Sequence, residues 1–510
     1  MATLTTLPIA STPPRAGQIF AADALFVSAS SALALLLLGY HPYAEDGGIY
    51  ASAVALRINP ALFPAERAFA IGQTGLTLFV PLVAGLAKVL DFPLSLAILL
   101  LHVIAIVATL ATARQLARVL FSTRAAQNWS VLTLAVSLGL PVAGTSLYLC
   151  DPYLTARSLA TPLLLLATTA LLRRQHAWMA AGLLLAATLH PLMAVWTSLL
   201  LLLFHALQTS RPALLTSCIT LCVLVAMGLA HALSPGEAQP ILAASLSRKY
   251  WFLREWEAWE IVGLLAPLLL LGALGLGRIP RAHSSATPQA KGLALAGAIA
   301  IATVGAGSVL FIHTTDASHF LARLQPLRLL HPVYLLLLML LGGCLFPALP
   351  RRVAWGLSAS AAIALVGMQW CTYPSSNYFE LPGKASGNPW VRAFEWSARH
   401  TPVDAVFALD AHYTTLPGED AQLFRAIAQR SQLPDAAKDG GISSVMTDLA
   451  SHWKQASDAQ TGLDQATDVE RLTRLRRLGA SWIVLSSTSR TAFWCPYRNE
   501  AAKVCRLRQN

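Results

Sequence analysis

The chain has 510 residues, 55% of them hydrophobic and 12% charged, and its formal net charge is +12. A water-soluble protein of this length does not need so many long apolar runs, so the composition excludes an ordinary soluble enzyme. Most of the positive excess lies in residues 1–370, scattered over loops without the aromatic-interleaved strip of a nucleic-acid-binding protein. We therefore expect the basic loops to face anionic lipid, with no nucleic acid as a partner.

Uncharged runs of sequence predict transmembrane helices. Most of them can cross the roughly 30 Å hydrocarbon core, which takes about 20 helical residues. Leu, Ala and Val dominate and the breaks are Gly or Pro, so helices are expected rather than barrel strands. No small-x-small cleavage site follows the first run, which we expect to be retained as a signal anchor. The runs are 24–44, 68–87, 92–113, 125–150, 158–172, 175–210, 212–236, 261–277, 292–315, 329–350 and 353–379.

The basic residues predict the orientation of these helices. With the N-terminus and Arg15 inside, basic loops alternate as the positive-inside rule requires if 177–207 is two short helices broken at His190-Pro191. One segment between 68 and 113 must then be re-entrant or lie along the surface. The competing topology makes 177–207 one long helix and keeps both earlier spans. We prefer the first, because the second places five arginines outside: Arg114, Arg118, Arg124, Arg173 and Arg174. In both, other inner loops carry Arg211, Arg278, Arg281, Lys291, Arg351 and Arg352.

A soluble domain is predicted after Trp370. Asn388-Pro389 is typical of a helix start and leads into a helix at 390–400. The apolar runs 405–409 and 481–485 predict buried strands, and amphipathic helices are expected at 420–430 and 468–478, the latter ended by Gly479. Strands separated by helices indicate a small α/β layer with a parallel pairing. The polar stretch 432–461 has no assigned structure.

The whole sequence thus predicts two parts. Residues 1–370 form an all-α polytopic membrane domain of about eleven transmembrane helices, with an outer acidic loop at 40–70. Residues 371–510 form a small soluble α/β domain, and both topologies place it, like the acidic loop, outside the cytoplasm.

Two of the seven cysteines stand apart from the membrane runs. Cys495 and Cys505 lie in the domain placed outside, where oxidation is permitted. We expect a disulfide bond between them. A metal site is the weaker alternative, because no C-x-x-C pair accompanies them.

The strongest candidate for chemistry is the acidic pair Glu45-Asp46, set between aromatic residues and glycines at the end of a span. A carboxylate beside the bilayer is costly unless water, a metal or a cation stabilises it, so such acids are functional candidates. Asp151 and Arg157 are a second candidate, with a structural salt bridge as the alternative. Arg248-Lys249, followed by tryptophans, is typical of an interfacial belt but also suits a phosphate with a lipid tail or sugar beside it.

Four motifs carry a family resemblance: YHPYAEDGGIY at 40–50, NPALFP at 59–64, DPYLTAR at 151–157 and FRAIAQRS at 424–431. Together with the layout of a first span, an outer acidic loop, many spans and an outer soluble domain, they make the chain resemble bacterial multi-pass proteins of the GT-C superfamily of membrane glycosyltransferases. The layout covers the whole chain, whereas the motifs are short.

The resemblance implies a GT-C-like enzyme of the bacterial plasma membrane (inner membrane), in contact with membrane lipids. It would transfer a sugar from a polyprenyl-phosphate donor to a glycan, lipid or protein acceptor. Asp46 would be the catalytic base of an inverting displacement, with Glu45 assisting or binding a divalent cation, Mg or Mn. His41 and Asp151 would support the site. The leaving phosphate would be neutralised by one or more of Arg157, Arg248, Lys249 and Arg328.

Two other functions fit the same sequence. A non-catalytic protein of cell-envelope glycan or lipid assembly needs the same fold and no catalytic carboxylate. A transporter or flippase is less favoured, because paired Gly- or Pro-broken segments in matching halves are not visible.

Overall fold

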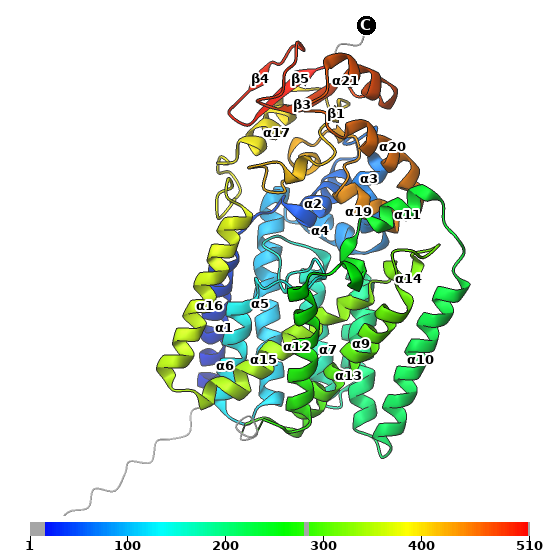
Figure 1. Ribbon diagram of the computed structural model, residues 1–510. Helices are drawn as coiled ribbons and strands as arrows, with labels where there is room; N and C mark the ends of the chain where they lie inside the picture. Colours follow the sequence, from blue (N-terminus) through cyan, green and yellow to red (C-terminus); the bar gives the residue numbers. More distant parts are fainter. Residues whose placement is uncertain (1–15, 280–284, 508–510) are drawn as a thin grey trace, which may run out of the picture.

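The computed structural model describes residues 16–279 and 285–507. Arg15 and Arg281, both used in the topology argument, lie outside the described residues. The protein is mostly helical, with a bundle of long helices beneath a small sheet (Figure 1). Between the two lies a layer of shorter helices that includes α2, α3, α4, α11 and α19 (Figure 1).

The helical part extends to Thr372. Its longest helix, α5, has 27 residues, and α1 and α16 pack side by side at one edge of the bundle (Figure 1). The helices are α1 (Ala16–Leu38), α2 (Glu45–Ile58), α3 (Arg67–Ile71), η1 (Gly72–Leu76), α4 (Phe79–Val89), α5 (Leu94–Leu120), α6 (Arg124–Ser137), α7 (Ala156–Leu172), α8 (His176–Leu189), α9 (Pro191–Leu207), α10 (Pro212–Leu233), α11 (Gln239–Leu246), η2 (Lys249–Trp251), η3 (Leu253–Glu255), α12 (Ala258–Gly275), α13 (Pro288–Phe311), α14 (Phe320–Arg323), η5 (Pro326–Leu329), α15 (Leu330–Leu345), η6 (Phe346–Ala348) and α16 (Arg351–Thr372).

Seven helical segments within the described ranges are long and apolar enough to cross a membrane, or eight if one bent pair is counted as a span. The bent pair, Arg67–Leu76 with Phe79–Val89, turns through 103°. It occupies the region where the preferred topology requires a re-entrant or surface-lying segment. Because seven or eight segments can cross a membrane, the chain is a multi-pass helical membrane protein.

The run 177–207 is not one helix. α8 ends at Leu189, His190 has a non-helical backbone with φ −149° and ψ 85°, and α9 begins at Pro191. A proline at the first helical position suits a new helix, because its missing N–H has no helical partner there, and the His190 ring accepts a bond from the Met193 backbone N–H at 3.4 Å. The prediction of a break at this point is confirmed, and the long-helix alternative is wrong.

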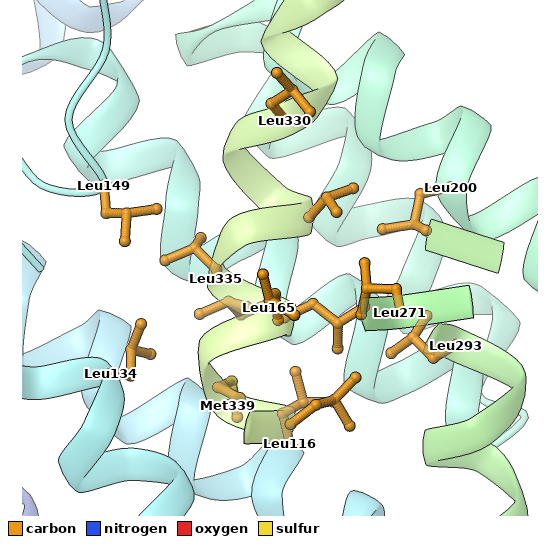
Figure 2. Packing of buried hydrophobic residues seen from close by; sticks show 14 of the residues in the cluster. Leu116, Leu134, Leu149, Leu165, Leu200, Leu271, Leu293, Leu330, Leu335 and Met339 are labelled. Atoms are coloured by element: carbon orange, nitrogen blue, oxygen red, sulfur yellow. The ribbon is translucent and has the colours of Figure 1, made fainter. Parts of the chain in front are cut away.

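Leucines from several helices meet in the interior of the bundle (Figure 2). Each contributing helix is apolar almost all round, so its inner face packs against neighbours and its outer face is left for lipid. α10 stands at the edge of the bundle in Figure 1 and is mostly exposed, as expected of a lipid-facing helix. The buried leucines include Leu116, Leu134, Leu165, Leu200, Leu271, Leu293 and Leu335.

Three arginines that carried the orientation argument share one partner. Arg114, Arg118 and Arg124 all bond to Asp23 of α1, with Arg114 Nη2 at 2.8 Å. The ion cluster ties α1 to the end of α5 and the start of α6. These basic residues therefore hold helices together as well as marking a loop.

The C-terminal residues 373–507, hereafter the cap, contain a mixed five-stranded sheet in the order β2-β1-β3-β5-β4. The predicted parallel pairing of the two apolar strands is confirmed, since β1 and β3 pair in parallel. β5 and β4 add an antiparallel hairpin that was not predicted. The elements are α17 (Pro389–His400), β1 (Val406–Ala408), η7 (Tyr413–Thr415), α18 (Phe424–Ala428), β2 (Ser431–Gln432), α19 (Lys438–Val445), η8 (Thr447–Leu449), α20 (Ala450–Gln460), α21 (Asp468–Leu475), η9 (Arg476–Leu478), β3 (Trp482–Ser486), β4 (Tyr497–Arg498) and β5 (Ala502–Arg506).

Local signals explain most of the cap helices. The Asn388 side chain accepts from the backbone of Trp390 and Val391 and so caps α17. Gly479, at φ +74°, ends η9 in the left-handed conformation that glycine adopts without strain. The helix expected at 420–430 is shorter than predicted and begins only at Phe424, because Asp420 and Ala421 both have positive φ.

Cys495 and Cys505 are joined by a disulfide bond. We expect both to resist alkylation in the natively expressed protein until a reductant is added, and Cys505→Ser to free Cys495 for labelling. The closed loop is short, so the bond stabilises the cap by about 2 to 3 kcal/mol at most. Mass spectrometry of the alkylated peptides measures the extent of labelling at each cysteine. Fast labelling of both thiols without reductant would disprove the bond in the natively expressed protein.

Candidate functional site

The acidic pair begins a helix. Residues 40–70 were predicted as an outer loop between spans, with no secondary structure assigned to it; α2 starts within it, at Glu45, and runs to Ile58. Acids in the first turn of a helix complement the helix dipole. Irregular backbone remains in the turn before Glu45 and at 59–66, between α2 and α3.

The cap holds this turn by backbone hydrogen bonds. Glu45 N–H donates to Ala421 O at 2.8 Å, and Leu423 N–H donates to Tyr43 O at 3.0 Å. Glu45 has φ +51°, a conformation that is costly for a side chain with a Cβ and persists only when surrounding contacts impose it. The position of the two carboxylates is therefore fixed from both the helical part and the cap.

The two glycines after the acids are needed for close packing. A Cβ on Gly47 would lie 2.8 Å from Tyr153 Cβ, and one on Gly48 would lie 2.5 Å from Leu423 Cβ. Any side chain at these positions would push the acidic turn away from the loop before α7 or from the cap.

A cavity of about 1060 Å³ opens beside the acidic pair. Its wall is formed by the ends of bundle helices, the segment 247–260 and α19 of the cap. It brings together seven of the eight residues predicted for catalysis, phosphate binding or support: Glu45, Asp46, Asp151, Arg157, Arg248, Lys249 and Arg328.

Lys438 of α19 pairs with both acids. Its ammonium bonds to Glu45 and lies 3.2 Å from Asp46 Oδ1. The Asp46 side chain is 48% exposed, because the cavity reaches it. Burial would raise the pKa of Asp46, but the charge of Lys438, with smaller contributions from Arg157 and Arg328, outweighs burial and lowers that pKa. Asp46 is thus an ionised carboxylate at neutral pH.

Arg157 is engaged with Asp151. Its Nη2 donates to Asp151 Oδ1 and Oδ2 at 2.7 and 2.6 Å, and both side chains are buried. Thr155 donates to the same carboxylate at 3.2 Å and caps α7, so the pair stabilises the entry into that helix. The salt bridge that sequence offered as the alternative is present at the cavity wall.

The other predicted cations are less constrained. Arg328 Nη1 lies 3.3 Å from His190 Nε2, and its Nε donates to Gln325. Lys249 is exposed, and Arg248 packs its guanidinium over Gly441, where a Cβ would lie 3.0 Å from Nη1. Beside them, the cavity is lined by the aromatic rings of Tyr250, Trp251, Trp256 and Trp259.

His41 does not line the cavity. Its Nδ1 lies 3.1 Å from Glu380 Oε2 of the cap, and its ring stacks on Tyr373 with centroids 4.0 Å apart. Gln422 also donates to Glu380, at 2.9 Å. His41 therefore joins the acidic turn to the cap outside the cavity.

A divalent cation does not fit the acidic pair. Both carboxylates already share the Lys438 ammonium, and Arg157 and Arg328 add positive charge nearby. No group of three or more His, Cys, Asp or Glu side chains that could hold a metal ion occurs within residues 16–279 and 285–507. The two carboxylates therefore bind the ammonium group of Lys438 in place of a metal ion.

Sequence reasoning missed Lys438, because 432–461 had no assigned structure. The segment 438–441 reads Lys-Asp-Gly-Gly and repeats the Asp-Gly-Gly of 46–48, but this repeat does not mark the contact, since Gly440 packs against Trp453 and Gly441 against Arg248.

The fold and site define a multi-pass helical membrane protein with a polar cavity beneath a C-terminal mixed sheet. No protein-family model matches the chain, and no curated protein matches it. Among solved structures, the chain is similar to the arabinofuranosyltransferase AftD from mycobacteria, determined by single-particle cryo-EM, with a TM-score of 0.47 and 17% sequence identity. The match covers 96% of this chain and 40% of that one, so this chain spans well under half the length of AftD.

Proposed function

We propose that the protein is a GT-C-type membrane glycosyltransferase that transfers a sugar from a polyprenyl-phosphate donor to a glycan, lipid or protein acceptor. The observation that carries the proposal is a cavity that combines the ionised Asp46 with a set of cations. A carboxylate suits an acceptor hydroxyl, and cations suit a phosphate.

In the proposed reaction, the carboxylate of Asp46 acts on the acceptor and the cations lining the cavity act on the donor phosphate. Asp46 takes the proton of the acceptor hydroxyl as that oxygen bonds to C1 of the sugar, and the bond from C1 to the phosphate oxygen breaks. The leaving polyprenyl phosphate carries the electron pair and is stabilised by Arg328, Arg248 and Lys249. Arg157 contributes charge from its salt bridge with Asp151. The aromatic side chains provide apolar surface for the lipid tail or a stacking face for the sugar.

The proposed topology has eleven crossings, with residues 1–370 in the membrane and 371–510 outside. It adds the shorter helices α6, α7, α8 and α9 to the seven long candidate spans. The acidic turn and the cap must lie on one side, because they share backbone hydrogen bonds. We expect that side to be extracytoplasmic.

Reporter fusions test the topology. Fusions after Trp370 and within 44–59 should both report the outer side of a bacterial inner membrane. A reporter active on both sides, placed after Arg211, should report the cytoplasm. A cytoplasmic signal after Trp370 would overturn both the topology and the oxidising setting of the disulfide.

The function is tested by transfer from a labelled polyprenyl-phosphate sugar in proteoliposomes, with empty liposomes as the control. Formation of a glycosylated acceptor with release of polyprenyl phosphate supports the proposal. Donor binding without any transfer would favour a role in envelope glycan or lipid assembly.

A further inference from the structure

Lys438 is a cap residue whose side chain contacts the acidic pair Glu45-Asp46. It is the first residue of α19, and its ammonium contacts both Glu45 and Asp46. Its side chain is 17% exposed, far less than that of Asp46. The ammonium is therefore shielded by protein, while the carboxylate faces the cavity.

The backbone that carries Lys438 is held by a buried network. Arg425 donates to both carboxylate oxygens of Asp439, at 3.0 and 2.9 Å. Asp439 accepts from the Asp435 backbone at 3.0 Å, and the Asp435 carboxylate accepts from the Lys438 N–H at 2.6 Å. Trp453 donates to Asp435 O at 2.8 Å. The cap thus fixes the point from which the lysine reaches the acids.

Other charged and titratable groups face Asp46 from several elements. The cations Arg157 and Arg328 act on Asp46 through space, but each bonds elsewhere, to Asp151 and to Gln325. Among the described residues, Lys438 is the cation in direct contact with Asp46, and Asp46 Oδ2 accepts no hydrogen bond. The facing groups are Glu45 and Tyr50 of α2, Lys438 of α19, Arg157 of α7, Arg328 of η5, and Asp151 and Tyr153 of the loop before α7.

We infer that Lys438 is a positioning residue that holds Asp46 Oδ1 and leaves Oδ2 free to take the proton from the acceptor hydroxyl. The inference rests on the proposed function, and it makes the cap part of the reacting site. Lys438 itself contacts neither the bond that forms between the acceptor oxygen and C1 nor the bond that breaks between C1 and the phosphate oxygen.

The pH dependence follows from the sign of the interaction. A carboxylate with a lowered pKa is active as a base above that pKa, and activity is lost as the pH falls through it. Lys438 lowers the pKa of Asp46, so removing its charge raises that pKa. The acidic limb of the kcat/KM profile should then move to higher pH by about one unit, the effect of one opposite charge in contact.

The test compares Lys438→Met with Lys454→Met. Lys454 is a matched control because it is a cap lysine whose exposed side chain pairs with Asp458 of its own helix. Lys438→Met should lower kcat and shift the acidic limb with the donor KM unchanged, Lys438→Arg should restore both, and Lys454→Met should match wild type. If Lys438→Met does not fold, Lys438→Gln serves the same test. An unshifted limb in a folded Lys438 variant would overturn the inference.

A second readout does not depend on turnover. Dicyclohexylcarbodiimide modifies protonated carboxyls, so the midpoint of Asp46 modification against pH, followed by peptide mass spectrometry, reports its protonation. That midpoint should rise in Lys438→Met and stay unchanged in Lys454→Met. If the wild-type protein transfers no sugar but the midpoint is higher in Lys438→Met than in wild type, the proposed function fails. The role of Lys438 in holding Asp46 ionised then still stands. An unchanged midpoint overturns the inference whether or not transfer occurs.

Discussion

Asp46→Asn should lower sugar transfer on the order of a hundredfold or more while expression and donor binding are kept. Asparagine has the size of aspartate and can still contact Lys438, but it cannot accept the proton of the acceptor hydroxyl. The initial rate of transfer in proteoliposomes measures the loss, and a donor-binding isotherm measures what remains.

Glu45→Gln is the matched control for this change. Glu45 bonds to the same lysine but, in the proposed mechanism, takes no proton, so its variant should be milder than Asp46→Asn. Full activity of Asp46→Asn, or complete complementation of a deletion strain by it, would remove the catalytic assignment and favour an assembly or binding role.

Arg157→Met should be the most destabilising of the cavity substitutions. It leaves the Asp151 carboxylate buried without its partner, which costs about 3 to 5 kcal/mol of stability. Replacing both partners, as Arg157→Met with Asp151→Leu, should recover most of the stability, because no unpaired charge remains. The thermal unfolding midpoint of the detergent-solubilised protein measures both.

Arg248→Met separates binding from stability. Arg248 makes no salt bridge within the described residues, so its loss should leave the unfolding midpoint unchanged. Donor affinity should fall about tenfold or more, since a hydrogen bond to a charged group contributes about 1.5 to 3 kcal/mol. Equal loss of stability in Arg157→Met and Arg248→Met would contradict the distinction between a structural and a ligand-binding arginine.

Much of the helical architecture was predictable, because long uncharged runs and proline breaks act locally. The break at His190-Pro191 and the cap of α17 at Asn388 are of this kind. The parallel pairing of β1 and β3 was also predictable, since buried strands separated by helices favour it.

What the sequence did not reveal depends on contacts between distant segments. Lys438 meets the acidic pair across 392 residues of chain, and His41 meets Glu380 across 339. The salt bridge between Asp151 and Arg157 was predicted only as an alternative to a functional role, because both interpretations fitted the same seven residues. The hairpin of β4 and β5 was missed because its strands are short and its first strand has two residues.

A cryo-EM structure with a bound polyprenyl-phosphate sugar tests the central claim most directly. The account predicts the phosphate in the cavity against Arg328, Arg248 or Lys249, with C1 of the sugar turned toward Asp46 and Lys438 still on Oδ1. A lipid phosphate bound outside the cavity, or a sugar turned away from Asp46, would contradict it.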